Sequence, residues 1–364
     1  MNTECKTMKV VAFPYDMELD SYLRNRQVLK NIDISFLGRP KGWRKKEYNS
    51  QLPIINDVEE VFDEVDAIWI VNSYQKLDFR DYIFPVIKAA VDRGKKIILS
   101  RSLSKEEQKL LENISLEKFV NFQQKEYSNY LKEDVEKIYE IDVPVIIVTG
   151  ITENTKKMDL QFKLYNQIKE REYFPYLLTS RHWNLAFKDD NIEEMPRFMF
   201  DEKISYKEKI ISLNHYIKAI EKLKEPDLFI IGVPGEAINY SNRIIQNLGE
   251  VSREIETAVT HDVSILGTTY QKFDINKLNK IIDDVERFLG MTIDYCYVVN
   301  RMINMDKAIE DDCLDFLFLD ENYVRKRVLE METDRVFYLE DSNECEELVN
   351  NIFDMLTSST KRVY

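Results

Sequence analysis

The stretch PVIIVTGITENTKKM, Pro144–Met158, carries the strongest fold signal in the sequence. A short apolar run, Val145–Thr149, leads directly into Gly150, and a polar segment then continues into an amphipathic pattern. This order is typical of a buried parallel strand, a tight loop and a helix. Phosphate-binding loops occupy the same place in many α/β proteins, because N–H groups and the dipole at a helix start attract anions.

The stretch matches a phosphate-binding loop only in part. Aligned on G-x-x-x-x-G-K-[ST], Gly150 and Lys156 stand at the expected spacing. Thr155 then replaces the second glycine, and Lys157 replaces the hydroxyl that binds Mg²⁺. Loss of that hydroxyl argues against phosphoryl transfer, which depends on the metal. Three interpretations stay open: an anion or nucleotide site, a competent NTPase, and a structural turn. The residues expected at a site in this loop are Gly150, Glu153, Asn154, Thr155, Lys156 and Lys157.

A second Gly-rich turn follows another apolar run in DLFIIGVPGEAI, Asp227–Ile238. Its residues expected to line the same sheet edge as Gly150 are Asp227, Gly232, Gly235 and Glu236. A third run, YCYVVN, ends at Asn300. Ligands of doubly wound sheets bind at the carboxyl ends of strands, so these residues are predicted to form one nucleotide or anion site. The alternative for Val233–Gly235 is a simple type II bend.

Apolar runs alternate with charged amphipathic segments along the whole chain, which predicts an α/β fold with two doubly wound, mostly parallel sheets. A length of 364 residues also favours two domains. We predict a Rossmann-like domain over 1–117, a helical connection over 118–142, and a degenerate P-loop-like domain over 143–364. The first strand-to-helix turn, FPYDMEL, lacks G-x-G-x-x-G, so dinucleotide binding by the first domain is not indicated.

Composition excludes several classes of function. The net charge is -14, so long-range attraction to nucleic acid or an anionic membrane is not expected. The four cysteines are scattered and the three histidines form no triad pattern, so no metal site is predicted. The N-terminal apolar run before Pro14 is too short for a signal peptide or a membrane span, which predicts a cytoplasmic protein.

The stretch RPKGWRKK, Arg39–Lys46, joins basic residues to an aromatic side chain just after a predicted strand. One interpretation is a groove for a peptide or another partner, with Lys41, Gly42 and Trp43 as binding residues, because tryptophan is enriched at binding hot spots. The other is a solvated loop that turns at Gly42.

Several of these stretches together resemble the peptide maturation system family. They are AFPYD, RPKGW, IVNSYQKLDFRDYIFPVIKAA, PVIIVTGITENTKKMDLQ and DLFIIGVPGEAINYSNRI. That family occurs mainly in clostridia, in gene cassettes for Cys-rich, ribosomally synthesised peptides, including bacteriocin-like ones, beside a radical SAM maturase. Glu153-Asn154-Thr155 matches a trait of the family. The second half also resembles a degenerate dethiobiotin synthetase-like phosphate-loop domain, a fold that reads the base where Asn300 stands.

The resemblance implies an accessory protein of peptide maturation that binds the precursor peptide or the radical SAM maturase. It implies at most weak binding of ATP or GTP. Two alternatives stay open: an ATP- or GTP-dependent ligase or kinase acting on the peptide, and a non-catalytic scaffold. A homodimer is a further open alternative.

Overall fold

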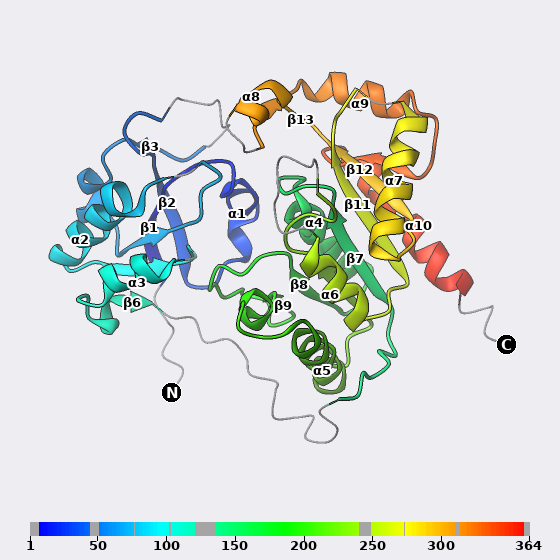
Figure 1. Ribbon diagram of the computed structural model, residues 1–364, viewed down its shortest axis with the longest axis horizontal. Helices are drawn as coiled ribbons and strands as arrows, with labels where there is room; N and C mark the ends of the chain where they lie inside the picture. The colour runs from blue at the N-terminus through cyan, green and yellow to red at the C-terminus, as the bar shows by residue number, and fades with distance from the viewer. Residues whose placement is uncertain are drawn as a thin grey trace. The chain divides into compact units, whose positions relative to one another are not determined.

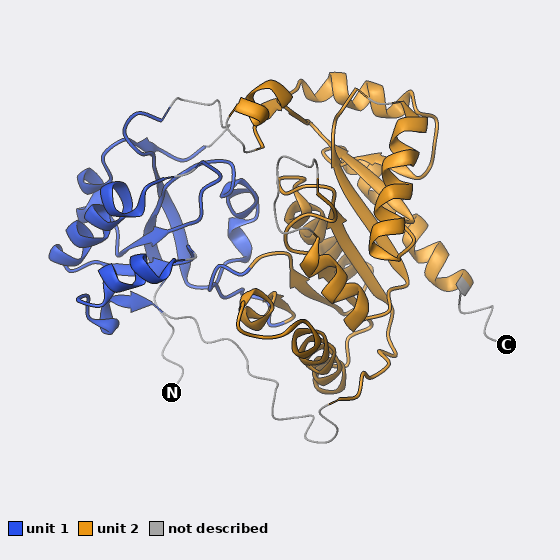
Figure 2. Ribbon diagram, in the orientation of Figure 1, with its two compact units in different colours: residues 1–125, 182–190 blue, residues 126–181, 191–364 orange. Residues whose placement is uncertain are grey.

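The chain forms two compact units, each built around one sheet (Figure 2). The computed structural model describes residues 7–43, 51–75, 77–101, 103–120, 136–239, 249–272, 274–310 and 314–359. Unit 1 contains residues 1–125 and 182–190, and unit 2 contains residues 126–181 and 191–364. The prediction of two doubly wound α/β domains is confirmed, because every neighbouring pair of strands within each of the two main sheets is parallel.

The sheet of unit 1 has the strand order β3-β2-β1-β4-β5-β6 (Figure 1). Its strands are β1 (Met8–Phe13), β2 (Ile32–Gly38), β3 (Ile54–Ile55), β4 (Ala67–Ile70), β5 (Lys96–Leu99) and β6 (Phe119–Val120). The order reverses between β1 and β4, the feature that marks a doubly wound sheet. β3 and β6, of two residues each, are too short to be predicted from an apolar run.

Helical elements cover one face of this sheet. The helical elements of unit 1 are α1 (Asp20–Arg24), η1 (Arg26–Val28), η2 (Val58–Glu64), the π-helical η3 (Phe79–Ile83), α2 (Phe84–Asp92), α3 (Lys105–Leu111) and η4 (Leu116–Lys118). Side chains of η2, α2 and α3, among them Phe62 and Ile87, pack against Ile68 and its neighbours in one apolar cluster. α3 begins with the capping box of Ser104 and Glu107 that its sequence predicts.

The other face of this sheet is covered partly by residues from much later in the chain. Trp183 packs its ring against Tyr22 of α1 and Trp69 of β4, with centroids 4.5 and 5.8 Å apart. The Trp69 indole N–H donates to the Ser100 hydroxyl at 2.7 Å, and that hydroxyl donates to the carbonyl of Trp183. The segment 182–190 therefore completes the core of unit 1.

This arrangement corrects the predicted domain limits. The division into 1–117, 118–142 and 143–364 assigned 182–190 to the second domain, whereas the segment belongs to unit 1. Part of the expected helical connection, Phe119–Val120, is strand β6, and the described residues 136–142 are not helical. Residues 121–135 of that predicted connection lie outside the described residues.

The main sheet of unit 2 has the order β15-β12-β11-β7-β10-β8-β9. Its strands are β7 (Val145–Gly150), β8 (Pro175–Thr179), β9 (Ile192–Glu194), β10 (Leu228–Gly232), β11 (Val263–Thr269), β12 (Tyr295–Val299) and β15 (Val336–Tyr338). The apolar run at Phe316, which resembles another strand of the alternation, instead pairs antiparallel as β14 (Phe316–Phe318) with β13 (Arg301–Ile303). β7 lies at the centre of the main sheet, between β10 and β11.

Helices cover both faces of this sheet. They are α4 (Lys157–Glu170), η5 (Arg197–Phe200), α5 (Tyr206–Lys224), α6 (Glu250–Ala258), α7 (Ile275–Leu289), α8 (Met305–Glu310), α9 (Glu321–Leu329) and α10 (Ser342–Ser359). Residues of α5, α6, α7 and α9 share one apolar cluster with the strands, whereas α4 packs against β7, β8, β10 and α10 outside that cluster. The amphipathic patterns of the sequence predict helices from about 206 to 224 and from about 275 to 289, and both are confirmed. The sequence also predicts a helix from about Tyr240 to Ala258, of which residues 240–248 lie outside the described residues. None of the described helices has the length and apolarity of a membrane crossing.

Candidate anion-binding site

The two Gly-rich stretches meet at the carboxyl edge of the sheet of unit 2. Gly150 ends β7, and its carbonyl accepts a hydrogen bond of 2.7 Å from the N–H of Ala237 in the turn after β10. On the other side, the Ile151 N–H donates to the carbonyl of Gly267 in β11 at 2.8 Å. The loop 151–156 is therefore held between the two strands that flank β7, at the place where the strand order reverses.

The backbone of the loop is left-handed at Asn154 and Lys156, with φ of 62° and 55°. Helix α4 starts at the next residue, Lys157. A phosphate-binding loop uses glycine for the left-handed residue that precedes its lysine and its helix. Lys156 therefore holds the position of that second glycine, Lys157 holds the position of the lysine, and Met158 that of the hydroxyl.

This geometry corrects the sequence alignment by one residue. The pattern with four intervening residues put Thr155 in the place of the second glycine, but Thr155 is not among the residues with positive φ. Thr155 is instead fully buried, and its hydroxyl lies 3.4 Å from the carbonyl of Thr152, to which it donates. A Cβ built on Gly150 would overlap the Thr155 hydroxyl, so glycine is required there.

Lys157 links the two stretches. Its ammonium donates to the carbonyl of Gly235, and the residue is only 8% exposed. The lysine stem runs close to Gly150, because the Lys157 Cδ would lie 3.2 Å from a Cβ built there. The charge of Lys157 is thus held at the base of the loop, within the site and out of bulk solvent.

Lys156 makes a second set of contacts across the sheet. Its ammonium donates to Asn300 Oδ1 at 2.9 Å and forms an ion pair with Glu340. Asn300 follows β12 and Glu340 lies two residues beyond β15, so this side chain joins the loop to two further strand ends. The contact with Asn300 agrees with the expected convergence at this edge. Glu340 carries no sequence signal that would have found it.

Arg301 is a further cation that sequence analysis missed. Its guanidinium donates from Nη1 to the carbonyl of Asn154 at 3.0 Å and lies 5.4 Å from the centroid of the Phe318 ring. Only 2% of the residue is exposed. The loop is therefore surrounded by Lys156, Lys157 and Arg301, of which Lys156 is ion-paired with a carboxylate.

Glu236 is the buried acidic residue of the turn after β10. It is 1% exposed, and neither carboxylate oxygen has a hydrogen-bond partner among the residues that the structure describes. The preceding Gly235 has a φ of 74°, which supports the predicted tight turn. A Cβ on Gly232 would overlap the Gln161 amide on α4, whose Oε1 accepts a hydrogen bond of 3.0 Å from the Ser180 N–H. Within the described residues, no group of three or more His, Cys, Asp or Glu side chains could hold a metal ion.

Burial also determines the protonation of a neighbouring phenol. Tyr297 of β12 is almost completely buried, and burial raises its pKa far above the usual range of tyrosine. The group is therefore a neutral phenol at physiological pH. It supplies no charge to the site.

Asp227 does not belong to this site. It precedes β10, and its Oδ2 accepts a hydrogen bond of 2.7 Å from the Phe174 N–H before β8. This places the carboxylate at the amino edge of the sheet, one strand length from Gly232. The prediction that Asp227 lines the site is wrong, because parallel strands separate their two ends.

The predicted partner-binding loop of unit 1 is also arranged differently from the expectation. Trp43 is partly buried and packs against the core of unit 1, so its ring is not a projecting anchor. Gly42 has a φ of 89°, and the exposed Lys41 lies 3.3 Å from the carboxylate of Asp57. These three residues therefore form an internally paired turn. Residues 44–46 of the basic stretch lie outside the described residues.

Comparison with known proteins supports the fold. No protein-family model matches the sequence, and no curated protein matches it. The crystal structure of a DUF1611 family protein from Anabaena variabilis is similar over 95% of this chain and 99% of that chain, with a TM-score of 0.59 and 11% identity. A plasmid partition protein from Borrelia burgdorferi is a weaker match, with a TM-score of 0.37 and 11% identity over 59% of this chain and 100% of that chain. A GTPase from Pyrococcus abyssi, in its apo form, matches with a TM-score of 0.32 and 13% identity over 58% of this chain and 97% of that chain.

Proposed function

We propose that unit 2 binds a phosphate-bearing ligand, such as ATP or GTP, at the loop 151–156. The observation that carries the proposal is the conformation of this loop. A central strand ends in Gly150, a left-handed residue precedes the helix, and the first helical residue is a buried lysine. The N-cap residue of α4, Lys156, makes no side-chain capping hydrogen bond, and the positive end of the helix dipole lies at this loop.

Lys157 is the residue proposed to bind the anion. On binding, its ammonium exchanges the carbonyl of Gly235 for phosphate oxygen, a stronger acceptor because it is charged. Met158 offers no hydroxyl for Mg²⁺ at the next position, so binding without rapid hydrolysis is the expected behaviour. The pairing of Lys156 with Glu340 lowers the positive charge near the loop and favours modest affinity.

A thermal-shift titration tests the proposal. ATP, GTP and inorganic phosphate are added with and without Mg²⁺, and the melting temperature of unit 2 is followed. Lys157→Ala is expected to weaken binding at least tenfold, because a hydrogen bond to a charged group contributes about 1.5–3 kcal/mol. Lys163→Ala is the matched control, since Lys163 lies on the same helix and its ammonium donates to the carbonyl of Leu339 at 2.6 Å. Equal shifts in both variants would remove the site.

The carboxylate of Glu236 has no hydrogen-bond partner in the described part of the chain, which favours a second candidate, an ATP- or GTP-dependent ligase or kinase. A carboxylate beside bound phosphates can hold Mg²⁺, which would replace the missing hydroxyl ligand. This candidate requires peptide-dependent release of phosphate over many turnovers. Glu236→Gln should abolish the release while leaving Mg²⁺-free nucleotide binding intact. Absence of any release with the purified peptide would exclude it.

The biological setting proposed for unit 2 is maturation of a ribosomally made peptide in the cytoplasm, as an accessory protein. The sequence stretches that resemble the peptide maturation system family support this setting. Co-purification of the chain with the precursor peptide and the radical SAM maturase tests it. Maturation that persists in the Lys157→Ala variant would favour the scaffold alternative over a nucleotide-dependent role.

A further inference from the structure

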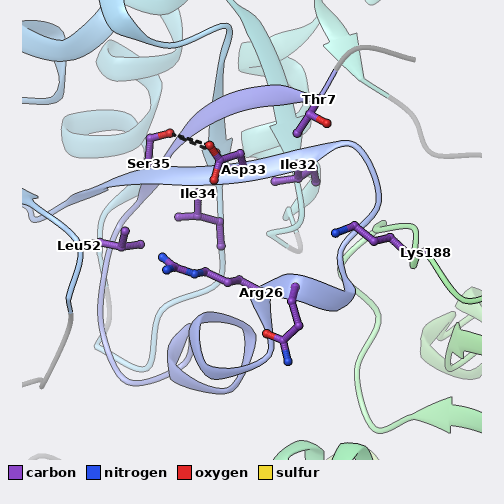
Figure 3. Close-up of a pocket in the computed structure, with 9 residues that line it drawn as sticks. Thr7, Arg26, Ile32, Asp33, Ile34, Ser35, Leu52 and Lys188 are labelled. Atoms are coloured by element: carbon purple, nitrogen blue, oxygen red, sulfur yellow. Dashed lines mark hydrogen bonds between the residues drawn. The ribbon is translucent and has the colours of Figure 1, made fainter. Parts of the chain in front are cut away.

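The strand β2 borders a hollow of about 500 Å³ whose lining residues all belong to unit 1 (Figure 3). The residues Ile32–Ser35 of β2 form one side of the hollow. Leu52 and Lys188 lie toward opposite ends of it, and Arg26 of η1 lies between them. The hollow therefore runs along one edge of a strand.

Among the described residues, strand pairing covers only the end of that edge. β3 contacts β2 at Leu37 and Gly38, and the Leu37 N–H donates to the carbonyl of Pro53 at 3.0 Å. Ahead of this pairing, Ile32–Phe36 have β1 on one side and no strand of the described chain on the other. The edge beside the hollow is thus an open continuation of an edge that already accepts a parallel strand.

The direction of the backbone groups follows from the ladder with β1. The Met8 N–H donates to the carbonyl of Asn31 at 2.9 Å, and Met8 is in register with Ile32. In a parallel ladder the backbone groups of alternate residues then point to opposite sides, so those of Ile32 and Ile34 point away from β1. No residue in the described ranges bonds to these outward groups. An unpaired edge of this kind is a template for another strand.

The charges around the hollow indicate what kind of strand would bind at this edge. Arg26 and Lys188 are exposed and make no ion pair within the described part of the chain. The backbone of Lys188 is held beside η1, because its N–H donates to the carbonyl of Val28 at 2.8 Å. The one carboxylate in the lining, that of Asp33, accepts a hydrogen bond of 3.4 Å from the hydroxyl of Ser35. Two cations thus face one carboxylate, which complements an acidic ligand.

We propose that the outer edge of β2 at Ile32 and Ile34 docks an extended acidic peptide segment as an added strand. Main-chain hydrogen bonds to the edge provide affinity, and Arg26 and Lys188 select acidic side chains. This site is separate from the anion site of unit 2. Only the identification of its ligand with a precursor peptide rests on the proposed maturation role.

The test uses the full chain and a fluorescein-labelled dodecapeptide of alternating valine and glutamate. Anisotropy measures its binding to the wild type, to Arg26→Glu/Lys188→Glu, and to Lys88→Glu/Lys105→Glu. The last pair changes two exposed lysines of α2 and α3 and leaves the same net charge as the first pair. A peptide of alternating valine and lysine is the ligand control. Amide hydrogen exchange of the β2 segment is measured with and without the acidic peptide.

The proposal predicts binding of the acidic peptide and at least tenfold weaker binding of the lysine peptide. Arg26→Glu/Lys188→Glu should lose at least tenfold in affinity, while the control pair stays within twofold of the wild type. Exchange at Ile32 and Ile34 should slow on binding. Peptide binding that leaves the exchange at Ile32 and Ile34 unchanged would overturn the proposal. Slow exchange at both residues in the free chain would also overturn it, because the chain would then cover its own strand edge. Either result leaves the nucleotide titration of unit 2 unaffected.

Discussion

The two units place opposite charges at equivalent strand-to-helix turns. In unit 1 the turn 14–19 follows β1, and in unit 2 the loop 151–156 follows β7. Both strands lie where the order of their sheet reverses, the usual place for a ligand. The first turn holds the buried carboxylates of Asp16 and Glu18, whereas the loop is followed and flanked by buried lysine and arginine.

Asp16 shows why the first turn is not expected to bind an anion. Its Oδ1 accepts a hydrogen bond of 2.9 Å from the N–H of Glu18. Its Oδ2 accepts bonds of 2.6 and 3.1 Å from the N–H groups of Tyr74 and Gln75, which follow β4. An internal carboxylate therefore already occupies the donors that would hold an external anion. In unit 2 the corresponding loop keeps a lysine at the start of its helix. Turns at the point where the strand order of a parallel sheet reverses therefore support different chemistry in the two units.

The largest expected effect concerns how the turn of unit 1 is supported. Trp183→Ala removes a buried ring that packs against Tyr22, on the helix that follows this turn. We expect a loss of about 3–5 kcal/mol in the stability of unit 1, as for other buried aromatic side chains. Chemical denaturation measures it. Trp43→Ala, which removes a partly buried tryptophan of the same unit, is the control and should cost less. Equal losses would mean that 182–190 has no special part in this core.

The second prediction separates the two turns by pH. Burial, with a smaller contribution from Glu18, raises the pKa of Asp16 from 3.8 to about 7. The folded state therefore binds this proton more tightly than the unfolded state does. The contribution of Asp16 to stability is greatest below pH 4, declines as the pH rises to about 7 and is then constant. A shift of this size corresponds to at most about 4 kcal/mol.

Denaturation curves between pH 4 and 8 provide the measurement. Asp16→Asn cannot titrate at this position, so the decline attributed to Asp16 should be missing from its profile. Lys157→Ala leaves the turn of unit 1 intact and should keep the wild-type slope. A wild-type slope in Asp16→Asn would show that another group titrates.

Much of this comparison was accessible from local sequence patterns. Apolar runs such as Val145–Thr149 reveal strands because burial on both faces makes them continuously apolar. Gly150 was identifiable because it ends such a run and precedes a helical pattern. The convergence of Gly150, Gly235 and Asn300 on one edge follows from the parallel arrangement, since every strand ends on the same side.

The features that could not be predicted from the sequence depend on contacts between distant residues or on backbone angles. Trp183 reads as part of a loop after β8, and nothing nearby shows that its ring fills the core of the other unit. Glu340 pairs with Lys156 across 184 positions of sequence. The position of the second glycine could not be assigned from a pattern of letters, because it is defined by the φ of Lys156. Because a lysine stands at that position, the residue type gives no sign of the left-handed backbone.

A third prediction concerns the close approach at the base of the anion loop. Gly150→Ala would place a Cβ against the hydroxyl of Thr155 and near the carbonyl of Thr152. Overpacking of this kind costs about 1–3 kcal/mol, and here it should also displace the loop and reduce phosphate binding. Thermal melting with and without phosphate measures both effects. Gly94→Ala in unit 1 is the comparison, because its added Cβ meets no atom within 4 Å and only the φ of 72° strains the alanine. It should leave phosphate binding unchanged. Full phosphate binding by Gly150→Ala would contradict the role of this contact.

The smallest expected effect tests which residue of the loop holds the position of the second glycine. Lys156→Ala and Lys156→Gly both remove the contacts with Asn300 and Glu340, but only glycine adopts a φ of 55° without strain. Lys156→Gly should therefore be more stable than Lys156→Ala by about 1 kcal/mol. At Thr155 the opposite order holds, because this fully buried residue does not have a positive φ. Thr155→Gly should be less stable than Thr155→Ala, by roughly 0.5–1 kcal/mol. Denaturation of the four variants measures both differences in stability. If glycine is the better replacement at Thr155 but not at Lys156, Thr155 holds the position of the second glycine, as in the alignment with four intervening residues.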